Sequence, residues 1–218
     1  MEEKDSAYLE KRRKRIIRFI AVTSIMTALS TILYFLRFPL PFFPPFLKVQ
    51  FSALPLLMLG LLEGPLAAVI GLLIKTLISL PFSSSQYVGE FADFLIGIAY
   101  LLSASIFYHY NKTKKGGIIA LVLSTVSWII AGALVNYLII IPFYIKAYGF
   151  DAVYGMLKGI RGITEDNYLL YYILFANIPF NALLSVVVNL VTYFTYKRVS
   201  RIVKWDERND KEKVEENN

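Results

Sequence analysis

Residues 46–82 read FLKVQFSALPLLMLGLLEGPLAAVIGLLIKTLISLPF, an alternating entry followed by two apolar runs that meet at a Glu-Gly-Pro turn. The first run, residues 51–62, would be about 18 Å long as a helix, which falls short of a hydrocarbon core about 30 Å thick. The second run, residues 65–82, begins with a proline, a residue suited to the first position of a helix. The stretch predicts a hairpin of two membrane helices. The short first helix leaves a recess at one end, and the segment before it forms a lid.

The composition is that of an integral membrane protein. Of the 218 residues, 56% are hydrophobic, and the mean hydropathy is +0.55, because long apolar runs recur with few polar interruptions. The net charge of +7 does not indicate nucleic-acid binding, since the lysines and arginines gather at the ends of the apolar runs, as membrane topology requires. One membrane domain is the simplest interpretation.

The residue types exclude several chemistries. The chain has no cysteine and one histidine, His109. Disulfides, thiolate catalysis and cysteine-ligated metals are therefore excluded, and almost nothing remains for a histidine metal site or general base. P-loop, G-x-S-x-G and H-E-x-x-H motifs are absent. We predict no enzymatic activity, no catalytic residue and no metal, and we expect any uphill transport to be powered by a partner or an ion gradient.

The remaining apolar runs predict further helices, over residues 16–36, 90–110, 117–144 and 168–196. The predicted fold class is an all-α integral membrane protein, a six-transmembrane-helix bundle with a ligand recess at the extracellular side. Its parts are a basic N-terminal arm, a membrane domain and a charged tail, over residues 1–15, 16–200 and 201–218. Residues 37–50 are rich in proline and so form no regular helix, and residues 146–167 are predicted as a long mixed-charge connection.

The positions of the basic residues predict the orientation in the membrane. With six helices, both termini lie on one side, together with the loop near residues 111–117. Most of the 23 lysines and arginines fall on that side, around residues 11–18, 112–115 and 197–213. The positive-inside rule places this side in the cytoplasm. The predicted location is the plasma membrane, multi-pass, with both termini cytoplasmic and the recess facing outward.

Asn136, Asn177 and Asn181 lie within apolar runs. Asn177 and Asn181 are four residues apart, so they share one face of a helix, and Asn136 lies on the preceding helix. An asparagine amide offers both a donor and an acceptor, which suits the imide-like edge of a heterocycle. The alternative is that these amides only form hydrogen bonds between helices.

Lys75, Glu90 and Asp93 are charged residues within predicted membrane helices. An isolated charge there costs on the order of 3 kcal/mol, so we expect these three to pair across the hairpin that joins their helices. The alternative is a proton or ion path. The aromatic residues of the 37–51 segment and Tyr87 are suited to stacking on a planar ligand, although interfacial belts also need aromatics.

Helix one carries small residues at Ala21, Ser24 and Ala28. Small residues spaced in this way permit close helix contact, within the chain or with a partner.

Several short motifs occur in an order and spacing that resemble a known family. They are LKVQFS with Pro55, Glu63-Gly64-Pro65, Lys75-Thr76-Leu77, Gly89-Glu90 and Pro179-Phe180-Asn181. Over about residues 16–200, the chain resembles the substrate-binding S components of energy-coupling factor (ECF) vitamin transporters, specifically the riboflavin-binding members. The resemblance implies a bundle that holds one vitamin near its outer face, beneath the loop between helices one and two. It also implies docking on a transmembrane coupling protein that is bound to two ATP-binding subunits.

The resemblance and the residue chemistry together define the predicted site. The candidate riboflavin-binding residues are Leu47, Lys48, Val49, Gln50, Tyr87, Glu90, Asn136, Asn177, Asn181 and Leu184. The candidate partner-docking residues are Ala21, Ser24 and Ala28. Family members often have lysine where this chain has Leu184, which leaves open the choice between riboflavin and FMN. No cofactor is predicted, since the flavin would be the transported substrate.

The prediction is therefore a riboflavin-binding subunit of a prokaryotic vitamin importer. One alternative is an S component for another vitamin, because the bundle alone does not choose the ligand. A second is a membrane-embedded lipid enzyme, which would require clustered acidic residues with a metal, or a histidine site. A third is an assembly protein with no small ligand.

Overall fold

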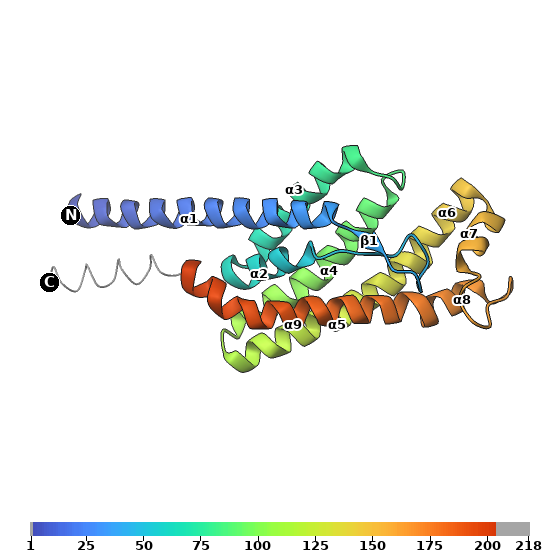
Figure 1. The fold of residues 1–218 in the computed structure, drawn as a ribbon. Coiled ribbons are helices and arrows are strands. Elements are labelled where there is room, and N and C mark those ends of the chain that lie inside the picture. The colour runs from blue at the N-terminus through green and yellow to red at the C-terminus, as the bar shows by residue number, and fades with distance from the viewer. Residues whose placement is uncertain (1, 204–218) are drawn as a thin grey trace.

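The structure is a computed structural model that describes residues 2–203 (Figure 1). Met1 and most of the tail predicted over residues 201–218 lie outside the described residues. The α-helices are α1 (Glu2–Phe35), α2 (Ala53–Glu63), α3 (Pro65–Ser79), α4 (Val88–Tyr110), α5 (Lys114–Val135), α6 (Ile141–Tyr148), α7 (Phe150–Leu157), α8 (Tyr168–Tyr172) and α9 (Ile178–Val203). A 3₁₀ turn, η1 (Leu80–Phe82), follows α3, and two π-helical segments, η2 (Asn136–Ile140) and η3 (Ile173–Asn177), precede α6 and α9. The strands are β1 (Phe38–Pro39) and β2 (Lys48–Val49).

Five helical segments are long and apolar enough to cross a membrane. They are Tyr8–Phe35, Pro65–Phe82, Val88–Tyr110, Lys114–Tyr148 and Tyr168–Ser200. The sixth predicted helix is α2, an apolar helix of 11 residues. Its Leu56, Leu57 and Leu59 are completely buried, and it packs against α1, α3, α4 and α9. A helix that is apolar on all sides belongs in the interior, and α2 lies at the centre of the bundle.

Helix α1 begins at Glu2, whereas the sequence analysis predicted a start at Ile16. The residues before Ile16 contain no proline or glycine and are mostly good helix formers. Lys14 and Glu10, four residues apart, form an ion pair of 3.2 Å on the helix surface, a pairing that supports a helix. The helix therefore continues beyond its apolar part.

The two longest predicted helices, residues 117–144 and 168–196, are interrupted by the π segments η2 and η3. Each segment ends shortly before a proline, Pro142 in α6 or Pro179 in α9. A proline inside a helix lacks one N–H donor and its ring clashes with the carbonyl four residues earlier. A wider π turn relieves that clash, so the prolines account for both interruptions.

The connection predicted over residues 146–167 contains a helix, α7, that the sequence analysis missed. Gly149, with φ of +86°, turns the chain between α6 and α7, a conformation that favours glycine. Val153 and Leu157 are four residues apart and both are buried. They therefore lie on one face of α7, which packs this segment onto the core.

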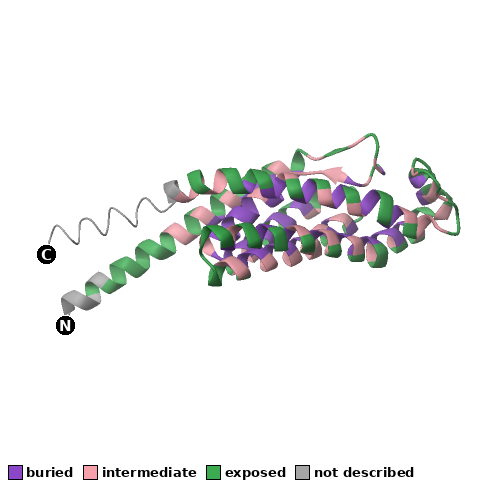
Figure 2. Cartoon of the chain, turned by 90° about the horizontal axis from the view of Figure 1, so that it is seen from below, coloured by how far each residue is buried: buried purple, intermediate pink, exposed green. Residues whose placement is uncertain are grey.

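The bundle has two distinct ends (Figure 1). The first turns of α1 and the last turns of α9 lie at one end, and β1, α7 and α8 lie toward the other. Figure 2 shows that buried residues line the inner faces of the helices, whereas residues 8–17 of α1 are exposed. The outer faces carry many exposed apolar side chains, such as Ile25, Leu77, Val122 and Leu190. The molecule is thus a helical bundle with an apolar exterior, which fits a multi-pass membrane protein.

Candidate ligand-binding site

A cavity of about 380 Å³ lies beside the segment that leads into α2. This volume is within the range of small-molecule sites in proteins. We name residues 36–52 the lid segment, because its residues 45–48 and Gln50 form one wall of the cavity. Arg37 of the lid segment, Tyr34 of α1, the loop before α4, and residues from α4, α5, η2, α6, α7 and α9 form the rest. The structure therefore has a cavity next to the segment that precedes the short helix, although no residue of α2 itself lines it.

The lid segment is a short hairpin fastened by aromatic rings. β1 and β2 pair antiparallel, with Phe38 opposite Val49. The ring of Phe46 packs edge-on against Tyr144 and Tyr172, with centroids 5.5 and 5.6 Å apart. A second lid ring, that of Phe43, packs against Phe180 at 5.2 Å. These lid aromatics thus contact aromatic residues of α6, α8 and α9.

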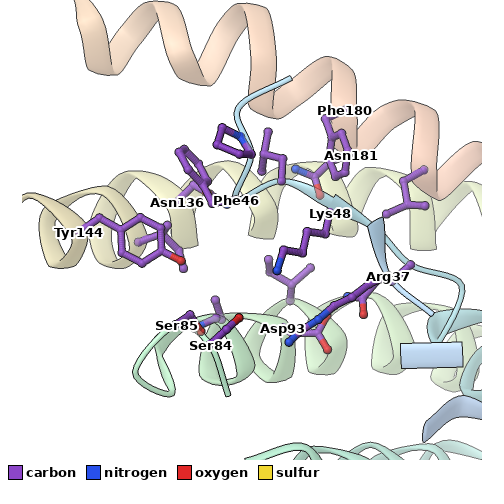
Figure 3. A pocket seen from close by; sticks show the side chains of 18 of the residues that line it. Arg37, Phe46, Lys48, Ser84, Ser85, Asp93, Asn136, Tyr144, Phe180 and Asn181 are labelled. Atoms are coloured by element: carbon purple, nitrogen blue, oxygen red, sulfur yellow. The ribbon is translucent and has the colours of Figure 1, made fainter. Parts of the chain in front are cut away.

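One end of the cavity presents asparagine amides. Asn136 and Asn181 both line the cavity, together with Trp128 and Phe180 (Figure 3). The Asn136 Nδ2 donates to the carbonyl of Gly132 at 2.8 Å, and the Asn181 Nδ2 donates to the carbonyl of Asn177 at 2.9 Å. These two amides, both singled out from the sequence, thus line the same cavity.

The same asparagines also form bonds between helices, which was the alternative interpretation. Tyr172 Oη donates to Asn136 Oδ1 at 2.6 Å, and Trp128 Nε1 donates to Asn181 Oδ1 at 3.1 Å. An amide has two N–H donors and two acceptor lone pairs, so these bonds use only half of its capacity. The interhelical bonds are therefore present, and each amide keeps one donor and one acceptor, so ligand binding by these asparagines stays a prediction.

Asn177 does not line the cavity. It is completely buried, and its Nδ2 donates to Tyr172 Oη at 3.4 Å. Its Oδ1 has no hydrogen-bond partner in the described part of the chain. Asn177 thus stands behind the cavity wall, in contact with the hydroxyl that bonds Asn136.

The other end of the cavity is charged. Lys75 and Asp93 form an ion pair, as predicted from their similar depth. The lid joins this pair, since Gln50 Nε2 donates to Asp93 Oδ1 at 2.6 Å. The Lys75 ammonium also stands over the ring of Tyr34, 4.7 Å from its centroid. A structural ion pair was the preferred interpretation, and Lys75 and Asp93 confirm it.

The prediction that Glu90 pairs within the same group is wrong. Glu90 forms an ion pair of 3.5 Å with Arg37, at the start of the lid segment. Tyr34 Oη donates to its Oε1 at 2.8 Å, and the hydroxyls of Ser83 and Ser85 donate to its Oε2 at 2.5 and 3.0 Å. Because Asp93 already pairs with the Lys75 ammonium, Glu90 bonds instead to groups at the end of α1 and in the loop before α4.

Lys48 brings a further cation to the cavity. Figure 3 shows its side chain extending from the lid toward the helix that carries Asp93. No ion pair is recorded for it among residues 2–203. Leu184, where the family resemblance leads one to expect a lysine, also lines the cavity. The cavity therefore contains a lysine, but the lid supplies it and not α9.

The predicted ligand-binding residues divide into two groups. Those that line the cavity are Leu47, Lys48, Gln50, Asn136, Asn181 and Leu184. Val49, Tyr87, Glu90 and Asn177 do not. Val49 lies between Lys48 and Gln50, and side chains alternate along a strand. Tyr87 is 60% exposed and borders a second, apolar hollow beside Phe91 and Phe143.

Several cavity residues were not predicted as ligand-binding residues. The main ones are Tyr34, Arg37, Ser85, Asp93, Trp128, Tyr144 and Phe180. Trp128 carried a signal, because it precedes Asn136 by eight residues and so lies on the same helix face, with Gly132 between them. Arg37 and Ser85 carried none, since the path of the lid and of the loop before α4 decides where they lie.

The predicted docking residues lie on the outside of α1. Ala21, Ser24 and Ala28 are all exposed. Thr23 and Thr27, on the opposite face of the helix, are buried where α1 packs against α2 and α3. The stripe of small residues is thus not used for packing within the chain. Among the described residues, no group of three or more His, Cys, Asp or Glu is placed to hold a metal ion.

Comparison with known proteins gives consistent relatives. The riboflavin transporter RibU of Staphylococcus aureus (strain TCH60) is 32% identical over 194 residues, which cover 89% of this chain and 94% of that protein. The riboflavin transporter FmnP of Bacillus subtilis (strain 168) is 29% identical over 131 residues, which cover 59% of this chain and 69% of that protein. The riboflavin transporter RibU of Streptococcus thermophilus (strain ATCC BAA-250 / LMG 18311) is 27% identical over 189 residues, which cover 85% and 84%.

The fold and a family model agree with these relatives. A solved structure described as "Structure and mechanism of the S component of a bacterial ECF transporter" matches with a TM-score of 0.66 at 30% identity, over 88% of this chain and 99% of that chain. The family model described as "ECF transporter, substrate-specific component" matches residues 18–196. The chain therefore belongs to the family of substrate-specific components of ECF transporters.

Proposed function

We propose that this chain captures riboflavin from outside the cell and delivers it inward when docked on an ATP-driven ECF module. The observation that carries the proposal is the pair of asparagine amides, Asn136 and Asn181, in a cavity that also holds Trp128 and Phe180. A flavin is a flat ring system with a carbonyl, N–H, carbonyl sequence along its imide edge, and amides match that edge. The riboflavin transporters among its relatives support this choice over another vitamin.

The charged end of the cavity suits the other part of riboflavin, its ribityl chain. Gln50, Ser84, Ser85 and Asp93 offer amide, hydroxyl and carboxylate groups there, and each can bond a hydroxyl of the sugar-alcohol chain. The isoalloxazine ring would then lie between lid and helices near Phe180, with the chain directed toward α4. No cofactor takes part, because riboflavin is the cargo.

FMN is a second candidate cargo, and Lys48 is the observation that favours it. Its ammonium has no ion-pair partner in the described part of the chain, and an opposite charge nearby would be attracted to it. Competition of FMN against bound riboflavin measures this directly. FMN that fails to compete at any concentration would exclude it.

The proposed orientation puts the cavity on the extracellular side of the plasma membrane and both termini in the cytoplasm. The lid and the start of α1 lie toward opposite ends of the bundle (Figure 1). Basic residues are concentrated in the first half of α1 and around the α4–α5 loop, and the positive-inside rule favours the cytoplasm for such segments. With α2 counted as the sixth helix, the chain enters and leaves on the same side.

The proposed partners are a transmembrane coupling protein and two ATP-binding subunits. Family membership supports docking on an ECF module, and the chain has no P-loop of its own. The exposed small residues of α1, Ala21, Ser24 and Ala28, are suited to close helix packing. We propose that they form the docking face.

Titration of the detergent-purified protein with riboflavin tests the proposal. We expect saturable quenching of flavin fluorescence. The variant Asn181→Ala should bind about 1–3 kcal/mol more weakly, because it removes a buried amide that pairs with the ring. Asn189→Ala is the matched control, since Asn189 lies on the same helix but bonds Leu121 and Thr125, away from the cavity.

Two results would count against the proposal. Wild-type protein that does not quench flavin fluorescence would refute riboflavin as the cargo and leave the other vitamins. Equal affinity of the Asn181→Ala and Asn189→Ala variants would remove Asn181 from the site.

A further inference from the structure

Each cavity asparagine is held from two sides by groups that fix which way its amide points. Asn136 Nδ2 donates to the Gly132 carbonyl, and a carbonyl can only accept. On the other side, Tyr172 Oη donates to Asn136 Oδ1 at 2.6 Å. The Tyr172 hydroxyl also accepts from Asn177 Nδ2 at 3.4 Å, so its own hydrogen is directed toward Asn136. A flipped Asn136 amide would lose its bond to Gly132, because two carbonyl oxygens would face each other, and it would need the Tyr172 hydroxyl to turn its hydrogen away.

The arrangement around Asn181 has the same logic. Its Nδ2 donates to the Asn177 carbonyl at 2.9 Å. Its Oδ1 accepts from Trp128 Nε1 at 3.1 Å, and an indole N–H can only donate. The amide of Asn181 therefore has one orientation as well.

The two aromatic donors are crossed between the helices. Tyr172, on α8, orients Asn136 on η2, while Trp128, on α5, orients Asn181 on α9. Each of the two long helical segments thus supplies one asparagine and the donor that fixes the other. The orientation of both amides depends on the two segments keeping their mutual position.

Packing holds the donors themselves in place. Tyr172 is completely buried, and Trp128 is 5% exposed. The indole of Trp128 stacks on Tyr100, with ring centroids 4.3 Å apart and planes 15° apart. A Cβ on Gly132 would come within 2.9 Å of the Asn181 amide, so α5 lies directly against that amide.

We propose that Tyr172 and Trp128 are positioning residues that set the order of donor and acceptor presented to the ligand. Each asparagine keeps one N–H and one lone pair, and their order is fixed before a ligand enters. An amide held in this way pairs its N–H with a ring carbonyl and its oxygen with the imide N–H of a flavin. This inference rests on the proposed function and explains how the site distinguishes one ring edge from another.

The test uses two ligands, riboflavin and riboflavin methylated on the imide nitrogen, which lacks that donor. Wild-type protein should bind riboflavin more tightly than the methylated ligand. In Tyr172→Phe, riboflavin affinity should fall on the order of tenfold, because the Asn136 oxygen loses its fixed partner. The methylated ligand should be affected much less, so the ratio of the two affinities should shrink. Trp128→Phe should shrink it in the same way.

The matched control is Tyr108→Phe. Tyr108 Oη is bonded to Tyr196 Oη at 3.1 Å, and neither residue lines the cavity. This variant loses an interhelical tyrosine hydroxyl bond without touching an asparagine, so its ratio of affinities should equal that of the wild type. If Tyr172→Phe weakens both ligands in parallel, Tyr172 is only a structural residue and the inference is overturned.

A double-mutant cycle separates positioning from general packing. If Tyr172 acts through Asn136, then Tyr172→Phe should have no further effect on riboflavin affinity in the Asn136→Ala background. Additive losses would overturn the inference. Wild-type protein that binds neither ligand would refute the proposed function, and the inference with it. Wild-type binding with an unchanged ratio in Tyr172→Phe would refute the inference alone.

Discussion

The carboxylate of Glu90 joins three parts of the chain. It accepts hydrogen bonds from Tyr34 at the end of α1 and from Ser83 and Ser85 in the loop before α4, and it pairs with Arg37 at the start of the lid segment. A charged group in a membrane protein is costly, but hydrogen bonds and an opposite charge offset that cost. Glu90 is therefore a structural anchor beside the cavity.

Glu90→Gln should test the anchor. The change keeps the shape but removes the negative charge, which leaves Arg37 without its partner, so the free energy of unfolding should fall by about 1–3 kcal/mol. The measurement is the thermal unfolding midpoint in detergent. Glu10→Gln is the control, because Glu10 forms an exposed ion pair with Lys14 and such pairs contribute little. Equal midpoints for the two variants would contradict the role assigned to Glu90.

Among the elements, the lid segment depends on others for its stability. Its strands have two residues each, and an isolated hairpin of that size is not stable in water. It is held by the rings of Phe43 and Phe46 and by the bond from Gln50 to Asp93. The lid should therefore open more readily than the helices beneath it.

Gln50→Ala removes one polar link between the lid and α4, and leaves the ion pair of Arg37 with Glu90 in place. We expect bound riboflavin to dissociate about tenfold faster, because the lid loses its hydrogen bond to Asp93 and the cavity loses one group proposed to bond the ribityl chain, while the association rate changes less. Stopped-flow fluorescence measures both rates. Phe42→Ala is the control, since Phe42 is in the lid but 93% exposed. A dissociation rate like that of Phe42→Ala would show that Gln50 does not hold the lid closed.

The π segments set the register of the amide-bearing helices. η3 ends at Asn177, two residues before Pro179, and Asn181 lies four residues after its end. A regular α-helix in its place would turn the preceding part by about 100°, the rotation of one residue. Tyr172 would then no longer face Asn136.

Pro179→Ala permits that regular helix. We expect unchanged or higher thermal stability, because the missing backbone hydrogen bond can form, together with riboflavin affinity lowered on the order of tenfold through loss of an aligned hydrogen bond. Pro65→Ala is the control, since a proline at the start of α3 breaks no helical bond. Wild-type affinity in Pro179→Ala would mean that the π turn has no part in binding.

In the molecule as a whole, the proposed binding site and the proposed docking face lie on different surfaces. The cavity lies under the lid, whereas Ala21, Ser24 and Ala28 are exposed along α1. Substitutions on that outer stripe therefore should not disturb the cavity.

Ala28→Trp tests this separation. The bulky ring should prevent close helix packing with a partner, so riboflavin binding to the isolated protein should be unchanged while uptake by the full complex is lost. Val122→Trp, on the exposed face of α5, is the control and should support uptake. Loss of binding in Ala28→Trp would instead make this face part of the core.

Much of this arrangement could be predicted from sequence, and the limits have physical reasons. Hydropathy predicted the five long spans and the short helix, and matched depth predicted the ion pair of Lys75 with Asp93. The partner of Glu90 was not predictable, because the prolines of the lid exclude helix but do not specify a path to Arg37. The π segments were missed although Pro142 and Pro179 marked them, since a proline in a helix is compatible with a kink as well as with a wider turn.

The burial of α2 has a consequence for how the protein is made. Its 11 residues are about 16 Å long as a helix, too short to cross a bilayer alone, and the helices that surround it include α3, α4 and α9, all synthesised after it. When synthesis has reached only Glu63, three of the helices that pack against α2 are therefore not yet made. The helix can settle only as those later segments insert, and the lid that leads into it settles at the same time. The candidate site is thus completed late in biogenesis, when the bundle closes around α2.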